Sequence, residues 1–321
     1  MFFSTSQPPH AAFKLVADGQ ILSTTQPPSS TQSAMVAMAR GEGTAALARL
    51  GIAKLRADGR LPAPLTTSET GASLGDSGEV LGLLAGNELT CALSISSSGK
   101  WSPAHGFPDS KAAMSFEDDT GADIRLEHTL PGRSRALYFD SVREVLDTMT
   151  EFSAFADEVR FQAPAPALML ALSIGMDRDE ASYPLPFTAL VVDVVVQAVT
   201  APTHRLKNQL LVPRPYADWA GLPHQIEPKL DKPGYSGFPS GHATVSAAIA
   251  AVLTGLGHTL PAPLVGQIAR NRERAGLHTG VDSIEGLALG TALGGWLVAA
   301  AAHEQAFPTW RKIFLAAQKT A

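Results

Sequence analysis

The sequence predicts a mainly α-helical protein, in which a helical bundle forms the C-terminal half and a region of mixed or irregular structure precedes it. From Tyr138 onward, apolar residues recur at steps of three and four, which places them on one face of an amphipathic helix; they are Val142, Val145, Leu146, Met149, Phe152 and Val159. Proline and glycine stand at most of the later junctions, where they begin or end helices. Further helices are expected at about 165–175, 185–212, 242–258, 262–275, 282–303 and 307–319.

The N-terminal region differs from the C-terminal half in composition and in its pattern of apolar residues. Two Pro-rich patches in the first 30 residues predict extended arms, and the segments TQSAMVAMAR and GTAALARLGIAKLRADG predict helices interrupted at residues 41–43. Residues 61–135 are rich in Ser, Thr, Gly and Asp, and the runs LTCALSIS and ADIRLEHTL predict either a small sheet or long loops. We therefore divide the chain into an N-terminal region of unknown role, residues 1–137, and a bundle, residues 138–321.

Composition and charge exclude some classes of function. The chain has 321 residues, of which 45% are hydrophobic and 17% are charged, so it can bury a sizeable core. Its net charge is −5 and it has no basic tract, which argues against a nucleic-acid partner. Cys91 has no second cysteine to pair with, and the N-terminus MFFSTSQPPH lacks the basic and apolar regions of a signal peptide. We expect a cytoplasmic protein; association of identical copies is left open.

One segment near the C-terminus has a membrane-like composition. GLALGTALGGWLVAAAA, residues 286–302, is uncharged but falls short of the roughly 20 residues that span a bilayer, so a buried core helix is expected. The other long apolar run carries Asp193 and Gln197, which would be costly against lipid. A membrane partner is therefore not expected. Glycines at four-residue spacing predict close packing against a neighbouring helix: Gly286, Gly290 and Gly294.

Three clusters in the predicted bundle carry chemistry, and the first is KNQLLVPRP. Lys207 lies in the last turns of a predicted helix, and Arg214 follows it by seven residues. Pro213 and Pro215 end that helix, and Pro215 favours an extended conformation at Arg214, which directs this side chain away from the helix end. Cations are also common near helix C-termini because they offset the dipole, so this cluster alone does not define a site.

The second cluster is GYSGFPSGHATVSAAIAAVL, in which a Gly- and Pro-rich loop leads into an apolar helix. Ser240 is a natural N-cap, and Gly241 allows a ligand to approach the backbone closely. The free N–H groups of the first helical turn suit an oxyanion. Ordinary capping beside a partly exposed His242 is an equally good interpretation of this cluster by itself.

The third cluster is RNRERAGLHTGVDSIEG. Arg272 and His278 are six residues apart, which is about 240° around an uninterrupted helix, so they would not share a face. Gly276 resolves this conflict if it ends the helix in a left-handed cap. Asp282 lies four residues after His278 and is able to accept its ring N–H, although it also fits a helix N-cap in a capping box. Its two oxygens could serve both roles.

Together the clusters read Lys-x6-Arg-Pro, Pro-Ser-Gly-His and Arg-x5-His-x3-Asp, over roughly residues 190 to 300. This pattern resembles the superfamily of type 2 phosphatidic acid phosphatases and vanadium haloperoxidases, and it implies a helical bundle of that type. The sequence departs from the family at Asn271, where members often carry Ser, and at residues 279–281. By resemblance, the ligands of the oxyanion would be Lys207, Arg214, Ser240, Gly241 and Arg272. His278 would be the nucleophile of a phosphatase, or the axial ligand of vanadate in a haloperoxidase; His242 would be the acid–base group, with Asp282 orienting His278.

The residues themselves support an anion site. Three cations brought into one bundle would be costly without a multiply charged anion, and arginine forks match the oxygens of a tetrahedral oxyanion. A phosphatase needs no cofactor here, whereas a haloperoxidase would hold vanadate and oxidise a halide with hydrogen peroxide. By resemblance, two further positions shape the pocket on the halide side. They are His204 and Tyr235, which are polar where chloroperoxidases have Trp and Phe, although simple packing near the bundle surface would also explain them.

We therefore expect hydrolysis of phosphomonoesters through a phosphohistidine. The first alternative is a vanadate-dependent haloperoxidase acting on a halide and an organic substrate. The second is binding of phosphate or a phosphorylated ligand without turnover.

Overall fold

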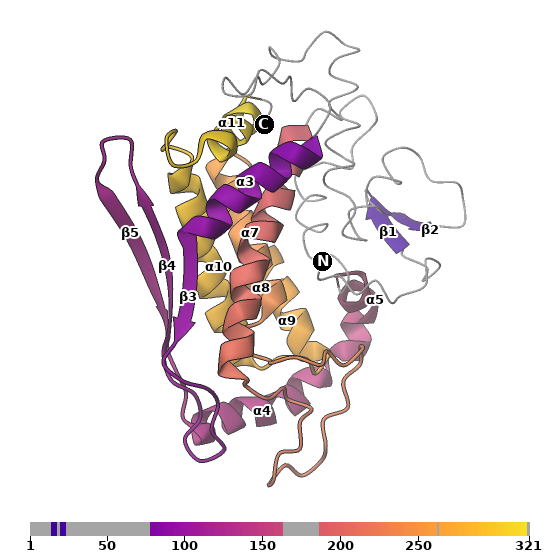
Figure 1. Cartoon of the computed structure of the whole chain (residues 1–321). Helices are drawn as coiled ribbons and strands as arrows, with labels where there is room; N and C mark the ends of the chain where they lie inside the picture. Colours follow the sequence, from indigo (N-terminus) through magenta and orange to yellow (C-terminus); the bar gives the residue numbers. More distant parts are fainter. Residues whose placement is uncertain (1–13, 18–19, 24–77, 163–185, 262, 320–321) are drawn as a thin grey trace.

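The computed structural model describes residues 14–17, 20–23, 78–162, 186–261 and 263–319, and this part of the chain is mainly helical, as predicted (Figure 1). The helices are α3 (Gly78–Ala92), α4 (Arg135–Met149), α5 (Phe152–Gln162), α7 (Pro186–Leu210), α8 (Gly241–Gly255), α9 (Leu264–Arg274), α10 (Gly280–Ala300) and α11 (Pro308–Gln318). The strands are β1 (Lys14–Ala17), β2 (Gln20–Ser23), β3 (Leu93–Ser97), β4 (Ser110–Glu117) and β5 (Asp123–Leu130). The helices predicted at 165–175 and between residues 31 and 59 lie outside the described residues.

The prediction of one long amphipathic helix from Tyr138 to Val159 was wrong. The segment forms two helices, α4 and α5, separated at Thr150 and Glu151. The Thr150 hydroxyl donates to the Asp147 carbonyl at 2.6 Å, which competes with continued helix bonding. The Glu151 carboxylate accepts hydrogen bonds from two arginines of α9, so a tertiary contact fixes the break.

The Ser- and Thr-rich region contains both a helix that was not predicted and a small sheet. The order of the sheet is β3-β4-β5, with both pairs antiparallel, so the alternative of long loops does not apply to these residues. The run LTCALSIS is only half a strand, because its first four residues end α3. Leu81, Ala85 and Leu89 recur at four-residue spacing on α3 and are buried against the core.

A single large hydrophobic cluster joins the sheet, α3 and the bundle. It contains Leu89 of α3, Met114 of β4, Val195 of α7, Leu293 of α10 and Trp310 of α11. The described residues on both sides of residue 137 therefore share one core, while the division at that residue stays a prediction.

Helices α8 and α10 pack closely through the predicted glycine stripe. A Cβ atom at Gly286 would lie 2.8 Å from the Ser240 carbonyl oxygen, and one at Gly294 would lie 2.6 Å from the Ala248 oxygen. Gly290 approaches the Thr244 carbonyl in the same way. This confirms the predicted packing, and it fixes the start of α10 against the start of α8.

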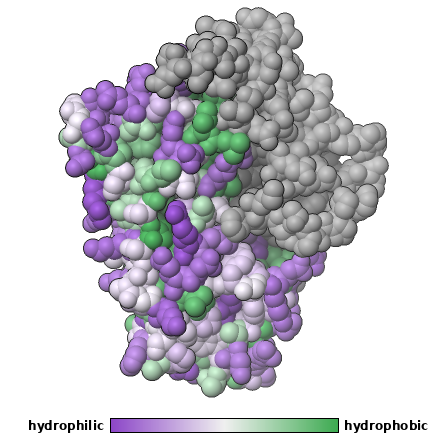
Figure 2. All heavy atoms as spheres, in the orientation of Figure 1, coloured by the Kyte–Doolittle hydropathy of each residue, from purple (hydrophilic) through white to green (hydrophobic). Residues whose placement is uncertain are grey.

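Among the described helices, α10 is the one long and apolar enough to cross a membrane, and half of its most apolar window is buried inside the protein. This burial is compatible with a soluble bundle, as is the surface in Figure 2, where hydrophilic and apolar residues of the described chain are interspersed.

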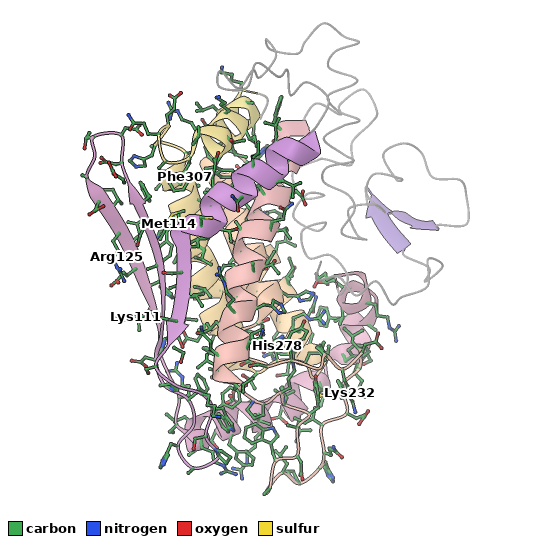
Figure 3. All side chains as sticks on the ribbon, viewed as in Figure 1. Lys111, Met114, Arg125, Lys232, His278 and Phe307 are labelled. Carbon is green, nitrogen blue, oxygen red and sulfur yellow. The ribbon has the colours of Figure 1, made fainter. Side chains whose placement is uncertain are left out.

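Figure 3 shows His278 inside the bundle, near the loop that joins α7 to α8, whereas Arg125 lies on the outer sheet.

Candidate active site

Lys207 reaches the glycine-rich loop from the last turn of α7. Helix α7 ends at Leu210, and Leu211 has φ +55°, which turns the chain before Pro213. The buried Lys207 ammonium donates to the carbonyl oxygens of Ser236, at 3.0 Å, and Gly237, at 2.8 Å. Burial, and then the charge of Arg214, hold the pKa of Lys207 well below its usual value. The first two clusters therefore meet as predicted.

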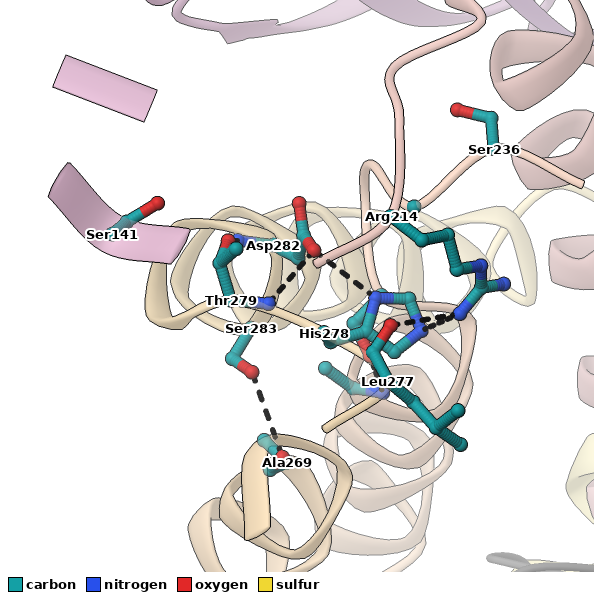
Figure 4. A network of polar contacts seen from close by, with 12 residues as sticks. Ser141, Arg214, Ser236, Ala269, Leu277, His278, Thr279, Asp282 and Ser283 are labelled. Atoms are coloured by element: carbon teal, nitrogen blue, oxygen red, sulfur yellow. Dashed lines mark hydrogen bonds and ion pairs between the residues drawn. The ribbon is translucent and has the colours of Figure 1, made fainter. Parts of the chain in front are cut away.

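Arg214 connects the second cluster to the third (Figure 4). Its Nε donates to the Tyr235 carbonyl at 2.8 Å, and its Nη1 donates to the Leu277 carbonyl at 3.0 Å. The same Nη1 lies 3.1 Å from Nε2 of His278. The guanidinium is buried, so these contacts rigidly orient it beside the imidazole.

The hydrogen bonds of His278 define its tautomer. Its Nδ1 lies 3.2 Å from Oδ2 of Asp282, and its Nε2 faces Arg214. Because arginine can only donate and an ionised carboxylate can only accept, the proton belongs on Nδ1 and the lone pair on Nε2. Burial, and then the charges of Arg214, Lys207 and Arg272, lower the pKa of His278 well below its usual value. The site thus holds a neutral imidazole whose Nε2 lone pair faces the Arg214 guanidinium.

Asp282 combines two structural tasks in one carboxylate. The N-cap of α10 is Thr279 rather than Asp282, so the N-cap interpretation of Asp282 was wrong by three residues. In the capping box that forms, Asp282 Oδ2 accepts from the Thr279 N–H at 2.9 Å as well as from His278. Burial raises the pKa of Asp282, and the Thr279 hydrogen bond and the charge of Lys207 oppose that rise. The helix start therefore fixes the carboxylate that orients His278.

The start of α8 has the predicted N-cap, while its role as an oxyanion cradle stays a prediction. Ser240 is the N-cap of α8, and its Oγ accepts from the Ala243 N–H at 3.5 Å. The Ser240 N–H donates to the Asp282 carbonyl at 2.9 Å, which joins the starts of α8 and α10. A Cβ atom at Gly241 would have no neighbour within 4 Å among the described residues, so the backbone there is open to a ligand. His242 follows in the first turn and is half-buried.

Arg272 enters from the last turn of α9 and is 4% exposed. Its Nε and Nη1 are buried, and no group in the described part of the chain accepts a hydrogen bond from either. Burial, and then the charge of Arg214, lower the pKa of Arg272 to about 10. Helix α9 ends through Gly276, which has φ +72°, and this confirms the predicted left-handed cap.

The departure from the family pattern at Asn271 has a structural explanation. The buried Asn271 amide donates to Glu158 at 2.8 Å and to Gln162 at 2.7 Å, and its oxygen accepts from Arg274. These partners lie on α5 and α9, so Asn271 holds together the two helices behind Arg272.

His204 and Tyr235 lie beside the cations. Their ring centroids are 4.8 Å apart, and the Arg214 guanidinium carbon lies 4.9 Å from the Tyr235 ring centroid. The Lys207 ammonium lies 5.7 Å from the same centroid. Burial, and then the charges of Lys207 and Arg214, lower the pKa of His204 to about 4. Tyr235 is 41% exposed, so this pair lies where the cation cluster approaches solvent, and its pocket-shaping role stays a prediction.

Two groups next to the site were not anticipated from the sequence. The Tyr138 hydroxyl donates to Asp282 Oδ1 at 2.9 Å across a separation of 144 residues. The Ser236 Oγ is buried, and no described residue pairs with it. The sequence around Tyr138 carried no signal of its partner, because that contact depends on the packing of α4 against α10.

A comparison with family models agrees with this geometry. The model described as PAP2 superfamily matches residues 185–305, the part of the chain that runs from α7 through α10. Over these residues the chain is similar to the PAP2 superfamily. Members of that superfamily are generally phosphatases, which points to phosphatase-type or related hydrolysis. No curated protein matches the chain.

Proposed function

We propose that this protein hydrolyses phosphomonoesters through a phosphohistidine on His278. The observation that carries the proposal is the guanidinium of Arg272, whose Nε and Nη1 are buried without an acceptor among the described residues. Buried arginine donors are costly unless they are paired, and Lys207 and Arg214 add two further buried cations to this cluster. A phosphate dianion would supply both the charge and the acceptor oxygens.

The remaining donors suit the other oxygens of a phosphoryl group. The start of α8 offers N–H groups and the open backbone at Gly241, and helix N-termini bind phosphate readily. The Ser236 hydroxyl, buried without a partner among the described residues, is a further candidate donor. These groups would stabilise the charge that spreads over the equatorial oxygens during in-line displacement.

Two displacements complete the reaction. The Nε2 lone pair of His278 attacks phosphorus, a P–N bond forms, and the bond from phosphorus to the leaving oxygen breaks. His242 donates a proton to that leaving oxygen, and Asp282 stabilises the positive charge on His278 through Nδ1–H. A water molecule then gives a proton to His242 and attacks phosphorus, which breaks the P–N bond and releases inorganic phosphate. The neutral tautomer of His278 is the form that the first step requires.

Vanadate matches the same residues, because it is also a tetrahedral oxyanion that arginine and lysine can bind. Bound in this site, it would supply the peroxide chemistry of a haloperoxidase. No observation in the described residues favours that activity over hydrolysis. We therefore propose a small phosphorylated substrate, with no resident cofactor and no nucleic-acid partner.

The test uses wild-type protein and His278→Ala, both freed of phosphate. We expect the wild type to hydrolyse p-nitrophenyl phosphate with competitive inhibition by orthovanadate, since vanadate mimics the displacement geometry. His278→Ala should lose turnover but still bind inorganic phosphate in calorimetry. Peroxide-dependent bromination of a diketone by vanadate-loaded protein, without hydrolysis across a phosphomonoester panel, would overturn the proposal in favour of a haloperoxidase. Phosphate binding with neither activity would favour a binding protein.

A further inference from the structure

We infer that Tyr138 is a positioning residue for His278, acting through Asp282. The inference rests on the proposed function, and it extends the site beyond the residues that match the PAP2 superfamily model, since Tyr138 precedes residue 185. The chain of contacts runs from the Tyr138 hydroxyl to the Asp282 carboxylate and from there to the His278 ring.

The two oxygens of Asp282 divide their partners. Oδ1 accepts from Tyr138 at 2.9 Å, while Oδ2 accepts from the Thr279 N–H at 2.9 Å and faces His278 Nδ1 at 3.2 Å. A second acceptor near the phenol, the Pro213 carbonyl, is farther away at 3.4 Å. With both oxygens held, the carboxylate cannot rotate, so Oδ2 stays directed at the imidazole.

Tyr138 is able to hold this position because its ring is confined. It is fully buried, and its centroid lies 5.5 Å from that of Phe107, 5.7 Å from that of Trp101 and 5.9 Å from that of Trp219. Burial, and then the nearby charge of Asp282, raise the pKa of Tyr138 well above its usual value, so the hydroxyl keeps its proton. Trp101 and Phe107 precede α4, so the N-terminal region contributes to the orientation of the candidate nucleophile.

The glycine-rich loop lies beside the phenol and the carboxylate. A Cβ atom at Gly237 would lie 3.4 Å from Asp282 Oδ2 and 3.5 Å from the Tyr138 hydroxyl, so the glycine-rich loop closes over the pair. Arg133, just before α4, forms an ion pair with Glu285 in the first turns of α10 at 2.9 Å. Helix α4 and the start of α10 are therefore fixed relative to each other.

Removing the hydroxyl should affect catalysis rather than substrate binding. In Tyr138→Phe the ring packing survives, but Asp282 loses a donor that favours its ionised form. Such outer hydrogen bonds typically contribute a factor of about 10 or more to activity. We expect kcat to fall about 10-fold with KM unchanged, because the hydrogen bonds of the Tyr138 hydroxyl go to Asp282 and Pro213 and not to the side chains of the three cations. The acidic limb of the pH profile should move to higher pH, because the pKa of Asp282 rises further.

The matched control is Tyr216→Phe. Tyr216 donates to the Pro233 carbonyl at 2.6 Å. This change therefore also removes a tyrosine hydroxyl that makes a hydrogen bond, but that bond does not involve Asp282. Combining Tyr138→Phe with Asp282→Asn gives a double-mutant cycle. If Tyr138 acts through Asp282, the change should have no further effect in the Asp282→Asn background. An equal loss in the control, or the same fold-loss in both backgrounds, would overturn the inference.

A second measurement is independent of turnover. The ring nitrogens of His278, followed by nitrogen NMR of histidine-labelled protein, should show a protonated Nδ1 that shifts in Tyr138→Phe and not in Tyr216→Phe. If the wild type hydrolyses nothing but this resonance shifts, the proposed function fails and the positioning role stands. If the wild type hydrolyses and neither kcat nor the resonance changes, the positioning role fails. Should Tyr138→Phe not fold, the wild-type hydroxyl proton of Tyr138 should exchange slowly with water, and fast exchange would overturn the inference.

Discussion

Replacing Arg272 with methionine should stabilise the phosphate-free protein and abolish its stabilisation by phosphate. Arg272 has two buried N–H groups from which no described residue accepts a hydrogen bond, and its charge lies near that of Arg214. Methionine keeps most of the length and apolar stem of the side chain but removes the charge and both donors. The change therefore separates two effects of Arg272: the loss of stability that it causes without phosphate, and the stabilisation that it provides when phosphate binds.

The size of the effect follows from the pKa of Arg272. The decrease from its ordinary value to about 10 corresponds to roughly 3 kcal/mol of destabilisation of the charged form, at about 1.4 kcal/mol for each tenfold change. Two unsatisfied buried donors give a similar figure, at about 1–3 kcal/mol each. After imperfect packing of the methionine is subtracted, the free energy of unfolding should rise by about 1–2 kcal/mol.

The assay is urea unfolding with and without inorganic phosphate. Wild-type stability should rise with phosphate, by about 2.7 kcal/mol at a hundred times the dissociation constant. Arg272→Met should be more stable than wild type without phosphate and less stable at saturating phosphate, so the order of the two proteins reverses.

The control is Arg274→Met on the same helix. Arg274 pairs with Glu151 at 2.9 Å and with Asn271 at 2.7 Å, so its loss should destabilise the protein and leave the response to phosphate intact. If Arg272→Met is less stable than wild type without phosphate, then Arg272 does not destabilise the phosphate-free protein. If it responds to phosphate as strongly as wild type, then Arg272 does not bind the anion. Either result would refute the reasoning.

Two further predictions concern pH and packing. Because the pKa of His278 is lowered in the folded state, the unfolded chain binds a proton that the folded site excludes; stability should therefore fall as pH falls below about 6.5, and His278→Gln should flatten this dependence in unfolding curves. For the same reason the acidic limb of kcat/KM should lie below that pH, and a limb above it would contradict a neutral nucleophile. Gly290→Ala would place a Cβ atom 2.8 Å from that of Ala247 and against the Thr244 carbonyl, so it should cost about 1–3 kcal/mol in thermal unfolding. Gly295→Ala on the same helix meets no described atom within 4 Å and should be neutral or stabilising by up to about 1 kcal/mol, so equal losses at both positions would contradict the packing argument.

The sequence predicted those parts of the site that depend on local backbone preferences. Ser240 caps a helix because its short side chain can accept from the first turn, and Gly276 ends one because it tolerates a positive φ. Pro213 and Pro215 follow the end of α7 because proline cannot continue a helix, and the chain leaves Arg214 directed at the loop and at His278. Each of these signals spans only a few residues, so it could be recognised in the sequence without knowledge of the tertiary structure.

The break between α4 and α5 and the partner of Tyr138 were decided by tertiary structure. The helix breaks at Glu151 although the apolar pattern continues past it, and Arg270 and Arg274 of α9 bind the Glu151 carboxylate there. Asp282, in the first turn of α10, accepts a hydrogen bond from Tyr138, 144 residues away. Contacts over such separations exist only after the helices have packed, when burial makes an unpaired hydroxyl or carboxylate costly, so no short pattern in the chain could encode them.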